Sequence, residues 1–425
     1  MDSVRQEIPQ RYNTDEGAAG IYNIEQQAIM GYGLPPPEIL RECCELFEQA
    51  TSQRMKYELE NNAFLFQYGP AIGTTEFRES LASFLAEGYH SEVNKSDLVQ
   101  TSGATSGLHL ILSTLVDLAG VVFVDEYTYM IALTAISQFS TMKIVSVPLK
   151  DDGPDTDRLE ELVQQHRFAP SGKLFWGVYY TIPTFHNPTG IVFSEDKCQR
   201  LITLARNSDI LIACDDVYNL LHYANPEQAP PKRLFAYDIE GLGKIDGWRG
   251  NVISNGTFSK ILSPGIRLGW MECPPRCVEA FRQSGVLQSG GAANNYMGGV
   301  VSTMIQQGMA QKQLKLYSTK YAERLQAMLE TLDAKLPKEC TFSRPEGGYF
   351  VWIRFPEHID CAEMNKYSME KYRVSAVPGT RFSVTGEARN FMRLTFAFHS
   401  ADYLRKSVAT FCEAARGYMQ IVSSS

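Results

Sequence analysis

Lys260 lies in a segment whose residue types could hold a phosphate-bearing aldehyde. Apolar runs flank this segment on both sides, and we expect each run to form a buried strand. A buried lysine is costly unless its charge is used or removed, and a lysine amine forms a Schiff base with a carbonyl group. The hydroxyls of Thr257 and Ser259 and the fixed cation of Arg267 could hold a phosphate close to that amine. Together these groups suit pyridoxal 5'-phosphate (PLP), an aldehyde cofactor that a lysine binds.

The segment Thr101–Gly107, with the sequence TSGATSG, is a second candidate phosphate-binding site. It joins a predicted strand to the apolar stretch Leu108–Leu112. Loops of this kind at a helix N-terminus bind phosphate through their amides. Turns rich in Gly, Ser and Thr also cap many helices, so the segment alone leaves both roles open. The residues around Lys260 favour the phosphate-binding interpretation.

Asp215 follows the apolar run Ile210–Ala213. A carboxylate at the C-terminal end of a strand lies where α/β sheets bind ligands. Asp215 could hold a protonated pyridine nitrogen, which keeps the cofactor ring an electron sink. Tyr218, three residues later, could reach the ring hydroxyl. The alternative role for Asp215 is a helix cap.

Two further residues could contact the flat cofactor ring. Asn187, in the run Tyr180–Gly190, could donate a hydrogen bond to the ring oxygen. The sequence Asn-Pro-Thr-Gly is also a favourable turn, which is the alternative explanation for this motif. Tyr129 could stack on the ring, although core packing is the usual role of such a tyrosine.

Arg393 lies inside the apolar run Asn390–Phe396. An arginine in a buried strand needs a planar anionic partner, and bidentate pairing with a carboxylate suits its geometry. The α-carboxylate of an amino acid substrate fits this requirement. An ion pair within the protein is the alternative.

Between about residues 97 and 290, short apolar runs alternate with stretches of helical character. The expected strands are Leu98–Thr101, Val121–Val124, Lys143–Pro148, Leu174–Tyr180, Ile210–Cys214, Val252–Ser254 and Leu268–Met271. The expected helices between them include Gly107–Leu118, Thr128–Phe139, Asp157–His166 and Glu195–Asn207. This alternation predicts an α/β fold with a mostly parallel sheet that is covered on both faces.

The two ends of the chain have different patterns. Residues 1–35 predict an irregular arm, and Glu38–Tyr57 predicts a helix. Near the other end, apolar residues recur every three or four positions between Tyr321 and Leu336, which predicts a long packed helix. Strands of a smaller α+β unit are expected at Tyr349–Phe355, Val374–Val377 and Phe391–Phe396.

A chain of 425 residues is too long for one ordinary core, so we expect several domains. The first part is an N-terminal arm and small-domain segment, residues 1–45. The second is a large PLP-binding domain, residues 46–295. The third contains the long helix and a C-terminal small domain, residues 296–425.

Composition excludes several classes of function. A net charge of −8 argues against nucleic acid as a main partner, and no apolar run is long enough to span a bilayer. The N-terminus lacks the apolar core of a signal peptide. The nine cysteines contain no CxxC motif, so we expect reduced thiols, no metal site and a cytoplasmic location.

Taken together, these motifs resemble the fold-type I PLP-dependent enzymes of the class I/II aminotransferase family, from about Gly31 to Phe398. The run Tyr180–Gly190 and the seven-residue step from Lys260 to Arg267 are most similar to the 2-aminoadipate, kynurenine and MocR-type branch. The resemblance implies a three-layer α/β fold with a smaller α+β domain. It also implies a homodimeric aminotransferase with shared active sites.

The resemblance further implies roles for individual residues. Lys260 forms the Schiff base with PLP and transfers the catalytic proton, Asp215 pairs with the pyridine nitrogen, and Tyr218 contacts the ring oxygen. The other cofactor contacts are Gly103, Ala104, Thr105, Tyr129, Asn187, Thr257, Ser259 and Arg267, together with Tyr68, which reaches the neighbouring subunit's cofactor phosphate. The substrate contacts are Gly33, Asn187 and Arg393.

Two departures from the branch bear on the site. The pair Ala104-Thr105 stands where this branch often has two polar residues, so one side-chain contact to the phosphate is lost. Some members read acidic substrates with an N-terminal arginine, whereas Ile21–Glu25 contains none. We therefore expect bulky or aromatic amino acids as substrates, with an oxo acid such as 2-oxoglutarate as acceptor. PLP-dependent elimination, decarboxylation or oxidation, and a catalytically idle PLP-binding protein, are the alternatives.

Overall fold

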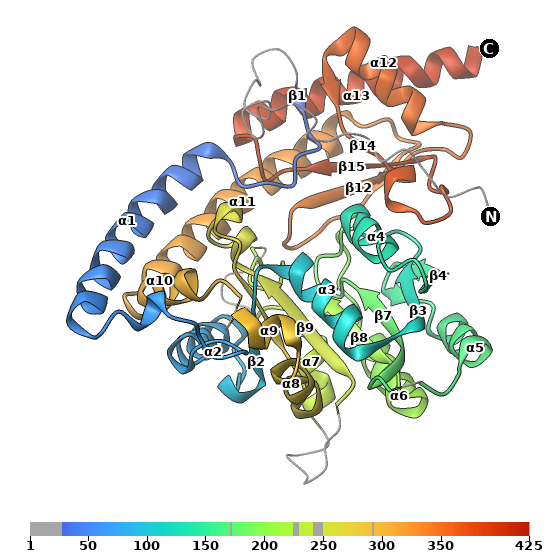
Figure 1. The fold of residues 1–425 in the computed structure, drawn as a ribbon. Helices are drawn as coiled ribbons and strands as arrows, with labels where there is room; N and C mark the ends of the chain where they lie inside the picture. Colours follow the sequence, from blue (N-terminus) through green and yellow to red (C-terminus); the bar gives the residue numbers. More distant parts are fainter. Residues whose placement is uncertain (1–27, 171, 224–228, 241–249, 291–292, 425) are drawn as a thin grey trace.

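The computed structural model describes residues 28–170, 172–223, 229–240, 250–290 and 293–424 (Figure 1). A seven-stranded sheet forms the centre of the larger part, with the strand order β2-β10-β9-β8-β7-β3-β4. These strands are β2 (Leu98–Thr101), β10 (Gly269–Glu272), β9 (Val252–Thr257), β8 (Leu211–Asp215), β7 (Phe175–Thr181), β3 (Val116–Asp125) and β4 (Lys143–Val147). All neighbours pair in parallel except β10, which is antiparallel to both β2 and β9.

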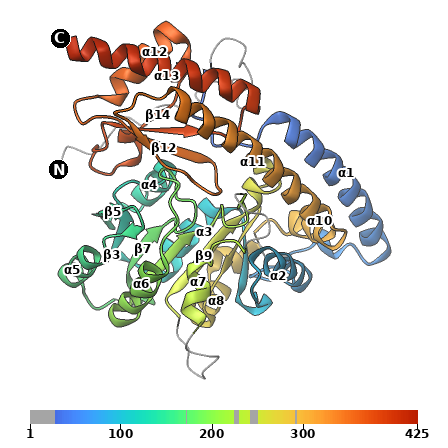
Figure 2. The same cartoon turned by 180° about the vertical axis from the view of Figure 1, so that it is seen from behind.

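Helices cover both faces of this sheet. Alternate strand residues point to opposite sides, so each strand presents apolar side chains to the helices on both faces. In β3, Val122 and Val124 join one hydrophobic core, whereas Val121 and Phe123 join the other. The first core includes α3 (Ala104–Leu115), which crosses the face seen in Figure 1. The second includes α5 (Thr156–His166), α6 (Glu195–Ser208) and α7 (Leu234–Ile239), which lie on the face seen in Figure 2. The resulting α/β/α sandwich is the predicted three-layer fold.

A smaller α+β unit lies above the sheet in Figure 1. Its four-stranded sheet has the order β11-β12-β15-β14. These strands are β11 (Thr341–Phe342), β12 (Phe350–Arg354), β15 (Phe391–Thr395) and β14 (Val377–Pro378). The unit also contains α12 (Cys361–Tyr372), α13 (Ala401–Ser424) and part of α11 (Met309–Lys335). The helix α1 (Pro37–Glu60) runs beside α10 (Asn295–Gln306) and α11 at the outer edge of the molecule (Figure 2).

A short strand near the N-terminus of the chain also belongs to the smaller unit. β1 (Ala28–Ile29) pairs in parallel with β13 (Val374–Ser375). The expected single strand Val374–Val377 is therefore wrong, since its first half pairs with β1 and Val377 pairs with Arg393 in β15. Ala376 separates the halves and donates its backbone N–H to Asn365 at 3.0 Å. Most of the predicted irregular arm lies in residues 1–27, outside the described residues.

The predicted helix Gly107–Leu118 is also displaced. α3 begins at Ala104 and ends at Leu115, and β3 starts at the next residue. The Asp117 carboxylate accepts a 2.9 Å hydrogen bond from the N–H of Ala119, a local contact that competes with helical bonding. The helix α2 (Thr75–Tyr89) occupies a stretch for which the sequence pattern predicts no element.

Candidate active site

A cavity of about 790 Å³ lies where the C-terminal ends of β8 and β9 meet α3 and the smaller unit. Most of the predicted site residues line it, although they come from distant parts of the chain. They are Gly33, Ala104, Thr105, Tyr129, Asn187, Asp215, Tyr218, Thr257, Ser259, Lys260, Arg267 and Arg393. Two predicted residues do not line this cavity. Gly103 immediately precedes α3, and the side chain of Tyr68 is 78% exposed on the surface.

Lys260 ends the short 3-10 helix that follows β9 and points into the cavity. Its Nζ donates a 3.0 Å hydrogen bond to the carbonyl of Gly33 and lies 5.5 Å from the ring centre of Tyr349. Burial lowers the pKa of Lys260 to about 8, and the positive charges of Arg393 and Arg267 act in the same direction. This lowering favours the neutral amine, which is the nucleophilic form.

Asp215 ends β8 and is buried. Its Oδ2 accepts a 2.6 Å hydrogen bond from the Tyr180 hydroxyl, while its buried Oδ1 accepts none from the described residues. Burial raises the pKa of Asp215 to about 6, against the opposing effects of Tyr180 and Lys260. The residues directly after Asp216 form a turn, so the alternative role as a helix cap does not apply. The unsatisfied oxygen fits a cationic N–H donor in the cavity.

Hydroxyls, an arginine and a helix N-terminus converge at one end of the cavity. Thr257 donates to Ser259 at 2.9 Å, and Arg267 Nη1 donates to the Ser259 hydroxyl at 3.3 Å. Gly103 precedes α3 with a φ of +101°, and a Cβ there would lie 2.8 Å from Arg267 Nη2. Glycine supplies no capping side chain, so the first amides of α3 stay available to an anion. This cradle fits a phosphate group.

Arg393 lies at the opposite side of the cavity, in the middle of β15. Its Nη1 donates to the Asn187 side-chain oxygen at 2.8 Å, and its Nη2 donates to the Gly31 carbonyl at 2.9 Å. The guanidinium lies 4.0 Å from the ring centre of Phe350. These described contacts are with neutral acceptors and an aromatic face, and the fork geometry of a guanidinium suits a carboxylate.

Sequence reasoning missed several residues that support the site. Tyr180 donates a hydrogen bond to Asp215. In the sequence, only its position at the start of the Tyr180–Gly190 motif indicated a role in the site. The carboxylate of Asp125, at the end of β3, accepts a 2.7 Å hydrogen bond from Thr181 and lies 3.3 Å from His186 Nε2. This buried network supports the loop that carries Asn187. The Asp125 contacts could not be found without the strand order, because β3 and β7 are far apart in sequence.

The residues of the cavity fit PLP in three respects: a buried lysine amine, an unsatisfied buried carboxylate oxygen and a phosphate-sized cradle. A sequence profile of the family described as aminotransferase class I and II matches residues 43–411. The chain belongs to this family. The protein is accordingly a PLP-dependent aminotransferase, and its substrates are amino acids and oxo acids.

Named relatives and solved structures agree with this assignment. The aromatic-amino-acid aminotransferase 1 of Thermococcus litoralis is 32% identical over 391 residues, which cover 91% of this chain and 88% of the relative. The 2-aminoadipate transaminase of Thermus thermophilus is 28% identical, over 92% of this chain and 90% of the relative. The crystal structure of Pyrococcus horikoshii kynurenine aminotransferase matches with a TM-score of 0.79 and 30% identity, over 94% of this chain and 93% of that chain.

None of the described helices combines the length and apolar character that crossing a bilayer requires. No described group of three or more His, Cys, Asp or Glu side chains is arranged to hold a metal ion.

Proposed function

We propose that this aminotransferase transfers the amino group of a bulky or aromatic 2-amino acid to an oxo acid such as 2-oxoglutarate. The observation that carries the proposal is the apolar wall beside Arg393. Val377 pairs directly with Arg393 across β14 and β15, so both side chains share one face of the sheet. Ile29 and Ile131 also line the cavity. Such a wall favours an apolar substrate side chain when the substrate α-carboxylate is bound by Arg393.

The charges around the cavity support the same preference. Among the described lining residues, the cationic side chains are those of Lys260, Arg267 and Arg393. We assign the first two to the cofactor and the third to the substrate α-carboxylate. A second carboxylate on the substrate would therefore find no additional described cation in this wall. The relatives named for aromatic amino acids and for kynurenine have compatible substrates.

When bound, PLP supplies an aldehyde carbon that takes up the amino group and a ring that accepts electrons from the substrate. We propose that Lys260 holds the cofactor and, once released by the substrate amine, moves a proton from the substrate Cα. The negative charge of Asp215 keeps the pyridine nitrogen protonated, which strengthens the ring as an electron acceptor. Tyr180 supports this role, because its hydrogen bond orients the Asp215 carboxylate.

The remaining site residues bind and orient. Thr257, Ser259 and Arg267, with Gly103, Ala104 and Thr105 at the start of α3, are proposed to hold the phosphate. Tyr129 stacks on the ring, and Asn187 and Tyr218 contact its oxygen. Gly33 and Arg393 hold the substrate, and Asn187 is shared because it already contacts Arg393 at 2.8 Å.

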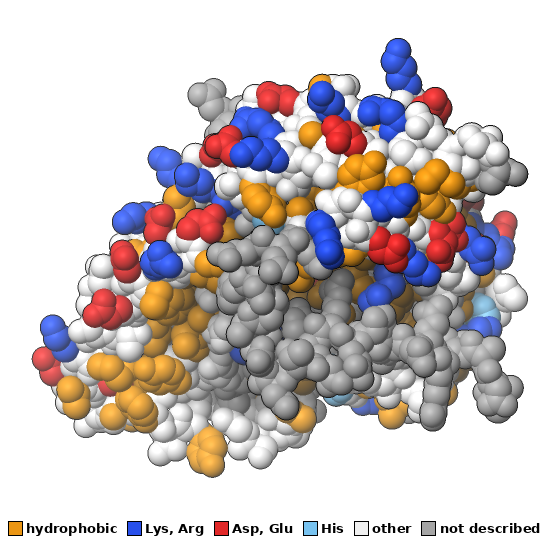
Figure 3. Space-filling model, turned by 90° about the horizontal axis from the view of Figure 1, so that it is seen from above, with side chains coloured by type: hydrophobic (Ala, Val, Ile, Leu, Met, Phe, Trp, Pro, Cys, Tyr) orange, Lys and Arg blue, Asp and Glu red, His pale blue; other side chains and the backbone are white. Residues whose placement is uncertain are grey.

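We also propose a homodimer in which Tyr68 reaches the cofactor phosphate of the partner subunit. The exposure of Tyr68 supports this role, because its side chain lies away from the cavity of its own subunit. Other large hydrophobic side chains of the same part of the chain are also exposed, and Figure 3 shows hydrophobic side chains gathered on the side where α1 lies. The exposed side chains are those of Tyr57, Leu59, Phe64, Phe66, Tyr68 and Tyr296. A second copy of the chain would remove this apolar surface from water.

The division into residues 1–45, 46–295 and 296–425 and the cytoplasmic location are also proposals. The separate seven-stranded and four-stranded sheets support the domain division. The nine cysteines are all free, which supports a reducing compartment.

A half-reaction screen tests the proposed substrate preference. The holoenzyme is mixed with one amino acid at a time, without an oxo acid, and the loss of the lysine-bound cofactor absorbance is followed. We expect faster conversion with phenylalanine, tyrosine and leucine than with aspartate or glutamate, and no conversion by Lys260→Ala. Each product oxo acid is identified by mass spectrometry. Preferred reaction with aspartate, or release of ammonia or carbon dioxide as the main product, would contradict the proposal.

A further inference from the structure

Asn294 holds the backbone of the phosphate-binding arginine. Its side-chain nitrogen donates to the carbonyls of Ile266 and Arg267, at 2.8 and 2.7 Å. Arg267 has a φ of +48°, a left-handed conformation that is unfavourable for a residue with a Cβ. The two hydrogen bonds from Asn294 therefore stabilise a strained backbone that aims the guanidinium at Ser259.

The next residue, Asn295, holds a different segment. Its side-chain nitrogen donates to the carbonyls of Leu65 and Gln67, both at 3.2 Å. These carbonyls belong to the loop Phe64–Tyr68, which we call the aromatic loop. Phe64, Phe66 and Tyr68 are 71%, 65% and 78% exposed, whereas Leu65 is buried. The loop thus exposes three aromatic side chains to solvent, while Asn295 holds its backbone.

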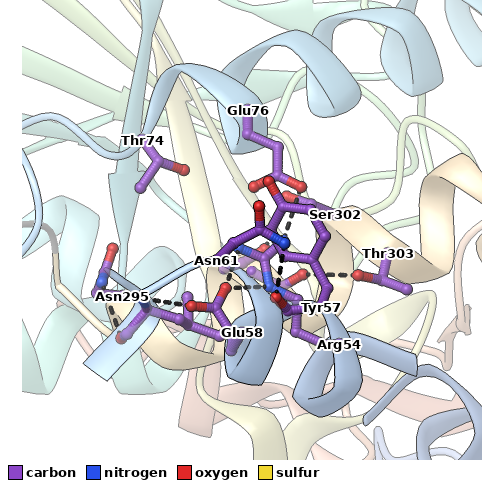
Figure 4. Close-up of polar contacts among 12 residues, drawn as sticks. Arg54, Tyr57, Glu58, Asn61, Thr74, Glu76, Asn295, Ser302 and Thr303 are labelled. Carbon is purple, nitrogen blue, oxygen red and sulfur yellow. Dashed lines mark hydrogen bonds and ion pairs between the residues drawn. The ribbon is translucent and has the colours of Figure 1, made fainter. Parts of the chain in front are cut away.

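A buried ion pair fixes the same loop from α1 (Figure 4). Glu58 accepts a 2.9 Å hydrogen bond from the N–H of Leu65 and pairs with Arg54, and both charged side chains are buried. Arg54 also pairs with Glu76 of α2 at 2.7 Å. Leu65 packs so closely on α10 that a Cβ at Gly299 would lie 2.4 Å from its Cδ1. The loop is therefore attached to α1 and α10, and Arg54 in turn links α1 to α2.

We propose that Asn294 and Asn295 are positioning residues that couple binding of the cofactor phosphate at Arg267 to docking of the aromatic loop on a second copy of the chain. This proposal rests on the PLP site and the homodimer of the proposed function. The adjacent side chains of Asn294 and Asn295 hold the backbone at Arg267 and the aromatic loop, respectively. When the cofactor phosphate orders the backbone at Arg267, the free energy needed to order the aromatic loop for docking is therefore lower, and the reverse also holds. Coupling of this kind is reciprocal: PLP tightens the dimer by the same factor by which the dimer tightens PLP.

The phosphate side is tested with Asn294→Asp, which keeps the size of the side chain but removes its amide donors. The dissociation constants of apoprotein for PLP and for pyridoxal, which lacks the phosphate, are measured by spectroscopic titration. We expect the ratio of pyridoxal to PLP constants to fall about tenfold, because hydrogen bonds that support the phosphate cation are lost. The matched control is Asn61→Asp, since Asn61 also donates to a backbone carbonyl, that of Tyr57 at 2.9 Å. An unchanged ratio in Asn294→Asp would overturn the proposal.

The loop side is tested by measuring the dimer dissociation constant by sedimentation, with and without PLP. The factor by which PLP tightens the dimer should fall in Asn294→Asp and in Asn295→Asp, to the part that the direct contact of Tyr68 with the phosphate supplies, and stay at the wild-type value in Asn61→Asp. A wild-type factor in Asn295→Asp would overturn the coupling. A wild-type protein that is monomeric and fully active would instead reject the homodimer of the proposed function. If thermal melting shows that an Asp variant is unfolded, the uncharged Asn294→Ala and Asn295→Ala variants are measured in the same way.

Discussion

The Nζ of Lys260 donates a 3.0 Å hydrogen bond to the carbonyl of Gly33, which lies 227 residues earlier in the chain. This contact brings the N-terminal segment over the amine that we assign to the cofactor. A Cβ at Gly33 would lie 2.9 Å from Cζ of Phe350, so the close approach favours glycine at this position. One side of the cavity is therefore formed by a backbone segment that only the folded chain brings into place.

We expect Lys260→Ala to abolish transamination and the absorbance of the lysine-bound cofactor, because no other lysine lines the described cavity. Borohydride reduction of the wild-type holoenzyme followed by peptide mass spectrometry should place the cofactor on Lys260. The control is Lys95→Ala, at a half-exposed surface lysine, which should retain activity and labelling. Cofactor recovered on a different lysine would refute the assignment.

Asp215→Asn should lower kcat about 100-fold or more, because a neutral amide does not stabilise a protonated pyridine nitrogen. The variant should still fold and bind PLP, since the cradle around Arg267 is unchanged. Stopped-flow half-reactions measure the loss directly. The neighbouring Asp216→Asn is the matched control, because Asp216 is also buried but does not line the cavity. Turnover of Asp215→Asn close to wild type would exclude this residue from the site.

The rate of PLP capture by apoprotein should rise with pH through a midpoint near 8. Burial lowers the Lys260 pKa from 10.5 to about 8, and the neutral amine that attacks the aldehyde accumulates above that pH. The negative charge of Asp215 opposes this lowering, so Asp215→Asn should move the midpoint to lower pH. Stopped-flow absorbance across neutral and alkaline pH measures both. A midpoint near the ordinary lysine pKa would show that the amine is not desolvated.

Arg393→Lys should lower kcat/KM, with a loss of transition-state stabilisation of roughly 1.5–3 kcal/mol. The reason is that an ammonium cannot reproduce the two parallel hydrogen bonds of a guanidinium to a carboxylate. The loss should be similar for every active amino acid, since all carry the same α-carboxylate. Arg354→Lys, at an exposed position on the adjacent strand β12, is the control and should behave as wild type. Steady-state kinetics that leave Arg393→Lys unaffected would limit this residue to a structural role.

Mixing the inactive variants Tyr68→Ala and Lys260→Ala should restore activity if active sites are shared. In the mixed dimer one site carries both lesions and the other carries neither, so activity should approach half of wild type per mixed dimer. Mixing Lys260→Ala with Asp215→Asn is the control, because both lesions affect the cavity of their own subunit and no intact site forms. Subunit exchange is verified by native mass spectrometry. Exchange without recovery would argue against the role of Tyr68.

The strand ends and their chemistry could be predicted from local sequence. Short apolar runs that end in polar residues mark the C-terminal edge of a parallel sheet, which is why Asp215 and Lys260 could be assigned to one site. The family and its cofactor followed from the same motifs. Local signals were weaker where a side chain alters the backbone: the Asp117 carboxylate accepts a hydrogen bond from Ala119, and the helix that was predicted to reach Leu118 ends at Leu115.

Only the tertiary structure decided which distant groups meet. Arg393 contacts Asn187 across 206 residues, and Tyr180 orients Asp215 across 35 residues. The pairing of Val377 with Arg393 sets an apolar side chain beside this arginine, yet one residue earlier the chain leaves that sheet. Such contacts depend on strand order and register, and side-chain periodicity within one segment carries no information about the neighbour that a strand will have. The sequence by itself therefore determined the chemical groups and the reaction class, whereas packing decided their partners, burial and pKa values.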